Sequence, residues 1–171
     1  MTRLHSICRW TFNSGKGGFT PGNIRPSWSN ENLPTEKLPA LIAKQIRPRL
    51  PDHIRLGFEV HYDYEINEAN SLAVADAMGE HDLPLAMITP GAHVHFGYGG
   101  IASCDPAERA KAIKYGEITV DLAYGPFRKV WDKLEVPTLV LWNGSWGYDL
   151  ATVGIRTMYE NLKANLAGLV R

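Results

Sequence analysis

The sequence predicts an α/β fold of the TIM-barrel type, with four parallel strands in sequential order, as in the first half of a (β/α)8 barrel. Strand and helix signals alternate four times, and such alternation indicates a parallel sheet covered by helices. The expected strands are short continuous apolar runs, which are typical of strands buried on both faces. The loops after the first and third strands are long and rich in glycine, aromatic residues and histidine, and α/β enzymes place their chemistry at that end of the sheet. A small open doubly wound sheet is the alternative.

The first strand is expected at 6–12, and the first helix follows a long loop. Glycine and proline are too frequent at 13–28 for regular structure. The helix is expected to begin at Thr35, because apolar residues then recur at helical spacing, and to end before Pro48.

The second and third units repeat this order. The run RLGFEVH predicts a strand at 55–61, and a helix is expected at 68–80. The run PLAMIT predicts the third strand at 84–89, before a second long loop at 90–103.

The third helix has a strong start signal, with Asp105 as N-cap and Pro106 at the first helical position. It is expected to extend to about residue 134, with a break at Gly125-Pro126. The fourth strand is expected at 136–142, and the last helix runs from about residue 154 to the C-terminus. The whole chain, 1–171, is expected to form a single domain.

Composition narrows the function classes. Lys and Arg number 18, equal to Asp and Glu, so charge gives no reason to expect nucleic acid or an anionic membrane as partner. Cys8 and Cys104 form no C-x-x-C pair, which suits a reducing compartment. The sequence begins without a signal peptide and contains no run of about 20 apolar residues, so a cytoplasmic protein is expected.

His61 is the first candidate for chemistry, because it ends the second expected strand. Asp63 and Glu65 share its side of an extended chain, where alternate residues point the same way. A carboxylate beside an imidazole can fix its tautomer and raise its basicity. The alternative is a partly exposed cluster at a strand end without a catalytic role.

Two loop motifs allow more than one interpretation. His93 and His95 form an H-x-H pair that could hold a metal, or could hydrogen-bond backbone or substrate. The segment SGKGG at 14–18 lacks the Ser or Thr of a phosphate-binding loop and precedes no helix, so a flexible binding loop is favoured.

Trp10 and Trp142 lie at the ends of the first and fourth expected strands. Two flat rings that face one pocket suit the C–H face of a sugar, and they exclude water from it. Asn143-Gly144 turns the chain directly after Trp142. The alternative for either ring is ordinary core packing.

Four segments in order resemble the xylose isomerase family. LVLWNGSWGYDL at 139–150 resembles the family's strand-four segment, and HVHFGYGGIASCDPAERAKA at 93–112 resembles its strand-three loop with the helix that follows. GFEVHYDYE at 57–65 resembles the strand-two segment with the catalytic His-Asp pair, and RWTFNSGKGGFTPG at 9–22 is similar, more loosely, to the strand-one segment.

The resemblance implies an aldose–ketose sugar isomerase that opens the sugar ring at a histidine and then shifts a hydride with the help of a metal. It assigns catalysis to His61, with Asp63 as the acidic residue. The implied substrate-binding residues are Trp10, Phe19, His93, Trp142 and Asn143, and Phe19 matches a residue that reaches into a neighbouring subunit's site.

This sequence also departs from the family. Tyr64 stands where the family has its Asp, Gly91 where it has a pocket Phe, and Ser145-Trp146 where it has Arg-Glu. A sugar-phosphate isomerase or epimerase of the same superfamily is therefore an alternative, as is a non-catalytic sugar-binding half-barrel. A DNA-repair endonuclease of similar barrel fold is disfavoured by the zero net charge.

The family binds Mg²⁺ or Mn²⁺ through residues of strands five to eight. No metal is therefore expected on this chain alone. An open half-barrel would leave two strand edges and an apolar interior uncovered, so a homo-oligomer or a missing C-terminal half is the expected partner, besides a small-molecule sugar.

Overall fold

A computed structural model of the chain describes residues 4–12, 33–63, 65–91, 95–141 and 155–169. Its centre is a four-stranded sheet with the strand order β1-β2-β3-β4, and all three pairings are parallel. The strands are β1 (Leu4–Cys8), β2 (Arg55–Tyr62), β3 (Leu85–Pro90) and β4 (Thr138–Leu139). The predicted parallel sheet in sequential order is confirmed.

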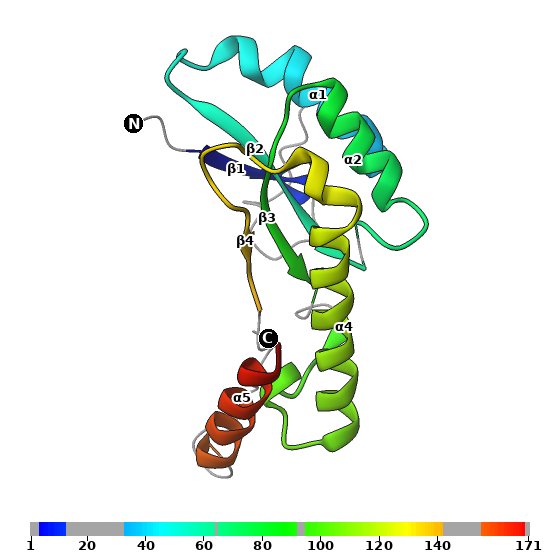
Figure 1. Cartoon of the computed structure of the whole chain (residues 1–171), viewed down its shortest axis with the longest axis vertical. Helices are drawn as coiled ribbons and strands as arrows, with labels where there is room; N and C mark the ends of the chain where they lie inside the picture. The colour runs from blue at the N-terminus through cyan, green and yellow to red at the C-terminus, as the bar shows by residue number, and fades with distance from the viewer. Residues whose placement is uncertain (1–3, 13–32, 64, 92–94, 142–154, 170–171) are drawn as a thin grey trace.

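The α-helices within the described ranges are α1 (Leu38–Leu41), α2 (Ser71–Glu80), α4 (Pro106–Tyr124) and α5 (Ile155–Leu169). In Figure 1, α1, α2 and α4 lie on the same side of the sheet, and α5 packs beside α4 at the far end of the molecule. No helix in the described ranges is both long and apolar enough to cross a membrane.

Three predicted elements were wrong in detail. The fourth strand, expected at 136–142, covers only Thr138–Leu139 among the described residues. The first strand ends at Cys8, and a 3-10 turn occupies Arg9–Phe12, where the Cys8 thiol contacts the Thr11 hydroxyl at 3.1 Å. The predicted helix from Thr35 is a series of short turns of mixed type around α1, and it continues through Pro48 as a 3-10 turn, Arg47–Arg49. Proline is tolerated at the start of such a turn because its missing N–H would have no partner there.

The third helix begins at the predicted N-cap and breaks at the predicted Gly125-Pro126, but helical structure ends at Val130, before the expected end near residue 134. The Asp105 side chain accepts a hydrogen bond of 2.9 Å from the backbone N–H of Ala107, so it caps the helix. The helix stops at Tyr124, and Gly125-Pro126 separates it from the 3-10 helix Pro126–Val130.

Alternate residues of β2 divide the sheet into an apolar face and a polar face. Phe58, Val60 and Tyr62 are buried in the main core with side chains of α1, α2 and α4. Glu59 and His61 point to the opposite face. Strand β4 does not fit the expectation of strands buried on both faces, because Thr138 and Leu139 are exposed. Within the described residues β1 and β4 each pair on one side only, so the sheet is open there.

Candidate active site

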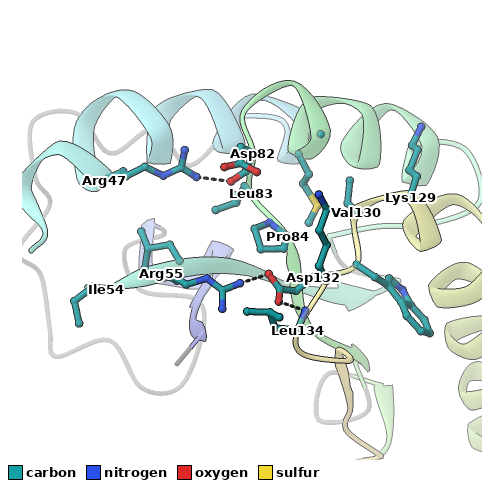
Figure 2. A pocket seen from close by; sticks show the side chains of 15 residues that line it. Arg47, Ile54, Arg55, Asp82, Leu83, Pro84, Lys129, Val130, Asp132 and Leu134 are labelled. Atoms are coloured by element: carbon teal, nitrogen blue, oxygen red, sulfur yellow. Dashed lines mark hydrogen bonds and ion pairs between the residues drawn. The ribbon is translucent and has the colours of Figure 1, made fainter. Parts of the chain in front are cut away.

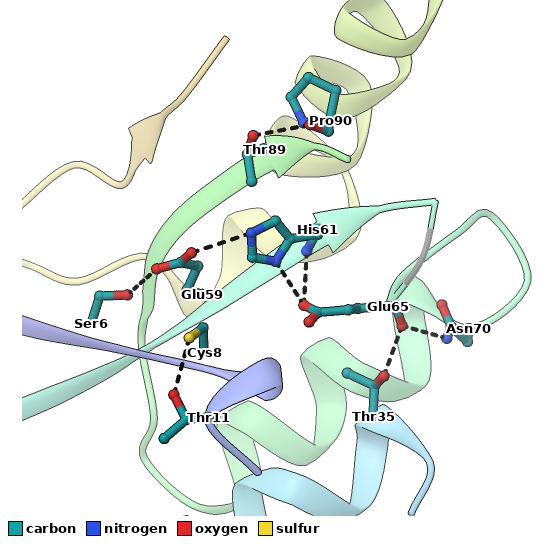
Figure 3. A network of polar contacts seen from close by, with 10 residues as sticks. All are labelled: Ser6, Cys8, Thr11, Thr35, Glu59, His61, Glu65, Asn70, Thr89 and Pro90. Carbon is teal, nitrogen blue, oxygen red and sulfur yellow. Dashed lines mark hydrogen bonds and ion pairs between the residues drawn. The ribbon is translucent and has the colours of Figure 1, made fainter. Parts of the chain in front are cut away.

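His61 lies between two glutamates near the carboxyl end of β2 (Figure 3). Its Nδ1 is 3.0 Å from Oε2 of Glu65, and its Nε2 is 3.3 Å from Oε1 of Glu59. All three side chains are buried. The predicted contact between His61 and a carboxylate is confirmed for Glu65.

The turn after β2 positions Glu65. The backbone N–H groups of Glu65 and Ile66 donate to the carbonyl oxygen of His61 at 2.9 and 3.1 Å, so the chain folds back on the strand end. The backbone carbonyl of Glu65 accepts from the side chains of Thr35 at 2.8 Å and Asn70 at 3.1 Å. Glu65 is thus held by two neighbours in sequence, His61 and Asn70, and by one distant residue, Thr35.

Glu59 has a second partner on the neighbouring strand. Ser6 on β1 donates a hydrogen bond of 2.8 Å to Oε2 of Glu59. A continuous chain of contacts therefore runs from Ser6 through Glu59 and His61 to Glu65. Glu59 is a site residue that the sequence interpretation missed. Its signal was a charged residue inside an apolar strand, two positions before the histidine.

The electrostatic environment keeps His61 charged. Burial by itself lowers the pKa of His61, but the hydrogen bonds and charges of Glu59 and Glu65 outweigh it and raise the pKa to about 9. His61 is therefore an imidazolium at neutral pH. On the same face, burial raises the pKa of the Cys8 thiol to about 11, so that thiol stays protonated.

Asp63 has partners other than His61. Its Oδ1 lies 2.6 Å from Nε2 of His95, and its Oδ2 accepts a hydrogen bond of 3.1 Å from Tyr115. Asp63 would share the side of His61 only in an extended chain, but β2 ends at Tyr62 and alternation stops there.

The other predicted site residues are not brought together by described structure. Trp10 lies in the 3-10 turn after β1, and its side chain is not among the described ones. Phe19, His93, Trp142 and Asn143 lie outside the described residues.

The described residues do not fit a divalent metal ion. Within them, no group of three or more His, Cys, Asp or Glu side chains is placed to hold one. Glu59 and Glu65 are both turned toward the ring of His61 (Figure 3) rather than toward a common point.

A groove of about 730 Å³ lies at the opposite end of the sheet, where β2 begins and the chain enters β3 (Figure 2). Its two arginines are engaged within the protein. Arg47 donates to the backbone carbonyls of His81 and Asp82 at 3.0 and 2.7 Å, and Arg55 pairs with Asp132. The groove contains none of the residues that contact His61.

No protein-family model matches the sequence, and no curated protein matches it. The candidate site therefore has to be judged by its own geometry, which combines a buried imidazolium, two carboxylates and a hydroxyl on one face of a parallel sheet.

Proposed function

We propose that the chain is the first half of a xylose isomerase-like barrel and that His61 is the proton-transfer residue of an aldose–ketose sugar isomerase. The observation that carries the proposal is the Glu59–His61–Glu65 group at the carboxyl end of a parallel strand. That end is where α/β barrels place their chemistry.

The arrangement of layers supports a barrel rather than a doubly wound sheet. A doubly wound sheet carries helices on both faces. Here α1, α2 and α4 lie on one side (Figure 1), and the opposite face carries Glu59 and His61. A sheet with its helices on one face is what half of a barrel would show, because the helices of a barrel form an outer ring.

The geometry favours a specific proton donor. The Nε2 contact to Glu59, at 3.3 Å, is longer than the Nδ1 contact to Glu65, at 3.0 Å. Glu59 also keeps Ser6 as a partner if it leaves the ring. A sugar ring oxygen can therefore replace Glu59 at Nε2. This oxygen receives the Nε2 proton as its bond to C1 breaks, the hydroxyl on C1 becomes the carbonyl and loses its proton to water, and His61 regains a proton from water. Glu65 remains on Nδ1 and holds the imidazole in place.

The resemblance also implies Mg²⁺ or Mn²⁺, which would polarise two sugar oxygens for the hydride shift. The described residues do not fit that ion. We therefore assign to this chain the proton transfer of ring opening and no step at the metal.

The same geometry favours one second candidate, a sugar-binding half-barrel without catalysis. Both ring nitrogens of His61 already face carboxylates, as they would in a purely structural ion pair. Ligand binding that ignores added Mg²⁺ or Mn²⁺ would mark this function, whereas aldose–ketose interconversion that requires the metal would mark the isomerase.

Both candidates require a partner for the open sheet, and we propose that activity belongs to an assembled form. The test separates the species of the purified chain by size with light scattering. Each species is then assayed for interconversion of aldoses and ketoses with excess Mn²⁺. We expect turnover only in an assembled species, and His61→Ala should lower it by roughly 10²–10⁴-fold. A monomer that isomerises sugar, or assembled species that never do, would overturn the proposal.

A further inference from the structure

A second polar group lies beyond the end of β2 and takes no part in the contacts of His61. Asp63 follows β2, His95 lies between β3 and α4, and Tyr115 lies on α4. These three elements converge on one carboxylate, because Asp63 contacts Nε2 of His95 through Oδ1 and accepts the hydroxyl of Tyr115 through Oδ2.

The contact between Asp63 and His95 favours a hydrogen on one ring nitrogen. Nε2 of His95 lies 2.6 Å from Oδ1 of Asp63, and a carboxylate charge at that distance favours an N–H over a lone pair at Nε2. The contact does not have hydrogen-bond geometry, so the attraction is electrostatic. In the neutral ring Nδ1 is then the nitrogen that carries the lone pair.

Aromatic packing holds the group in place. The rings of His95 and Tyr115 meet edge to face, with centroids 5.3 Å apart. The buried Phe96 ring lies 6.2 Å from His95 and 5.4 Å from Tyr115. The ammonium of Lys111 lies 5.5 Å from the centroids of both Phe96 and Tyr115. Such packing limits the rotation of the imidazole and of the phenol that donates to Asp63.

Tyr115 acts as a donor in this group. Burial raises the pKa of Tyr115, and the hydrogen bond to Asp63 raises it further, so the phenol stays protonated at neutral pH. It therefore fixes the Asp63 carboxylate and does not compete with His95 for a substrate proton.

His95 differs from His61 in the availability of its second nitrogen. Both nitrogens of His61 face carboxylates. The side chain of His95 is 25% exposed, and within the described residues its one polar contact is at Nε2.

We propose that His95 is a second proton-transfer residue, which accepts a proton from a sugar hydroxyl at Nδ1, with Asp63 and Tyr115 as its positioning residues. The inference rests on the proposed isomerase. The hydroxyl O–H bond breaks as the Nδ1–H bond forms, which leaves an alkoxide and an imidazolium paired with Asp63. Return of that proton to the product oxygen restores the neutral ring.

The first test is independent of activity. In the full chain with ¹⁵N-labelled histidines, two-bond proton–nitrogen correlations report which nitrogen of neutral His95 carries hydrogen. We expect hydrogen on Nε2 in the wild-type chain and more hydrogen on Nδ1 in Asp63→Asn, because the amide lacks the negative charge that favours hydrogen on Nε2. The matched control Asp76→Asn, at an exposed aspartate that pairs with Lys129, should keep the wild-type distribution. Hydrogen on Nδ1 in the wild-type chain, or an unchanged distribution in Asp63→Asn, overturns the proposal.

The second test uses whichever species of the chain isomerises sugar. We expect His95→Gln to lower kcat by roughly 10²–10⁴-fold while KM changes by less than about threefold. Asp63→Asn should lower kcat by at least about tenfold with the same small effect on KM, and Asp76→Asn should change neither. Turnover that survives His95→Gln overturns the role of His95 alone. Absence of turnover in the wild-type chain overturns the proposed isomerase as well.

Discussion

Oε2 of Glu65 accepts two hydrogen bonds from His61, each 3.0 Å long, one from the backbone N–H and one from Nδ1. A single buried oxygen thus holds both the strand end and the ring. The arrangement requires a proton on Nδ1, and with Glu59 at Nε2 it favours a proton on each nitrogen. The pKa of His61 and the stability of the fold are therefore coupled.

Stability should depend on pH through His61. The pKa in the folded chain is about 9, above its ordinary value of 6.5. The stabilisation from this pairing is therefore complete below about pH 6.5 and is lost as pH rises through about 9. Between these limits the free energy of unfolding should fall by roughly 3 kcal/mol from this residue, at about 1.4 kcal/mol per unit of pKa. Urea unfolding of the wild-type chain and of His61→Gln across this pH range measures the difference between their free energies of unfolding. A difference that stays constant with pH would show that the pKa of His61 is not raised in the folded chain.

The two glutamates should differ in importance. Glu65 accepts two bonds from His61 and is almost fully buried, whereas Glu59 has a longer contact to the ring and a second partner in Ser6. We expect Glu65→Gln to cost about 2–3 kcal/mol of unfolding free energy and Glu59→Gln about 1 kcal/mol, since hydrogen bonds to charged groups contribute most. Denaturant midpoints at neutral pH measure the loss of stability in both variants. A loss in Glu59→Gln that equals or exceeds the loss in Glu65→Gln would contradict the greater importance of Glu65.

The architecture was predictable because strand and helix periodicities differ. The apolar run at 84–89 and the run at 55–61 matched β3 and β2 to within one residue at each end. The Asp105-Pro106 start of α4 is a local signal, and local signals are readable from sequence. The end of β1 was misplaced because the residues at 9–12 are as apolar and aromatic as a strand, and Phe12 does enter the core, but from a 3-10 turn.

The site was only partly predictable, for a different reason. His61 could be predicted as a site residue from its position at a strand end. Glu65 and Asp63 could be predicted as its partners because they are close to it in sequence. Proximity could not separate these two carboxylates, because the turn after Tyr62 returns Glu65 to His61 while Asp63 meets His95 and Tyr115. Contacts between separate elements, such as Asp63 with Tyr115, depend on packing that no local pattern encodes.

Close packing of the polar face predicts a contrast between two glycines. A Cβ added to Gly57 on β2 would lie 2.7 Å from the Cβ of Ala86 and 3.0 Å from the carbonyl oxygen of Pro84, whereas a Cβ on Gly97 would meet nothing within 4 Å. We expect Gly57→Ala to destabilise the chain by about 1–3 kcal/mol through overpacking. Gly97→Ala should stay within about 0.5 kcal/mol of the wild-type chain. Thermal or urea unfolding measures the midpoints of both variants. Similar midpoints for Gly57→Ala and Gly97→Ala would show that the strands separate easily at Gly57.

The edge at β4 should control assembly. Leu139 on this edge strand is 36% exposed, and Leu134 and Val136 just before it are 81% and 74% exposed. Exposed apolar residues at an unpaired strand edge favour association with another strand, and lysine at such an edge opposes it. If the proposed assembly pairs through β4, Leu139→Lys should raise its dissociation constant at least about tenfold, a change of about 1.4 kcal/mol.

Leu72→Lys is the matched control, because Leu72 is 58% exposed on α2, away from this edge. Light scattering over a concentration series measures both variants. Equal association of Leu139→Lys and the wild-type chain would exclude β4 as the contact, and a fall in association for both variants would point to general charge effects.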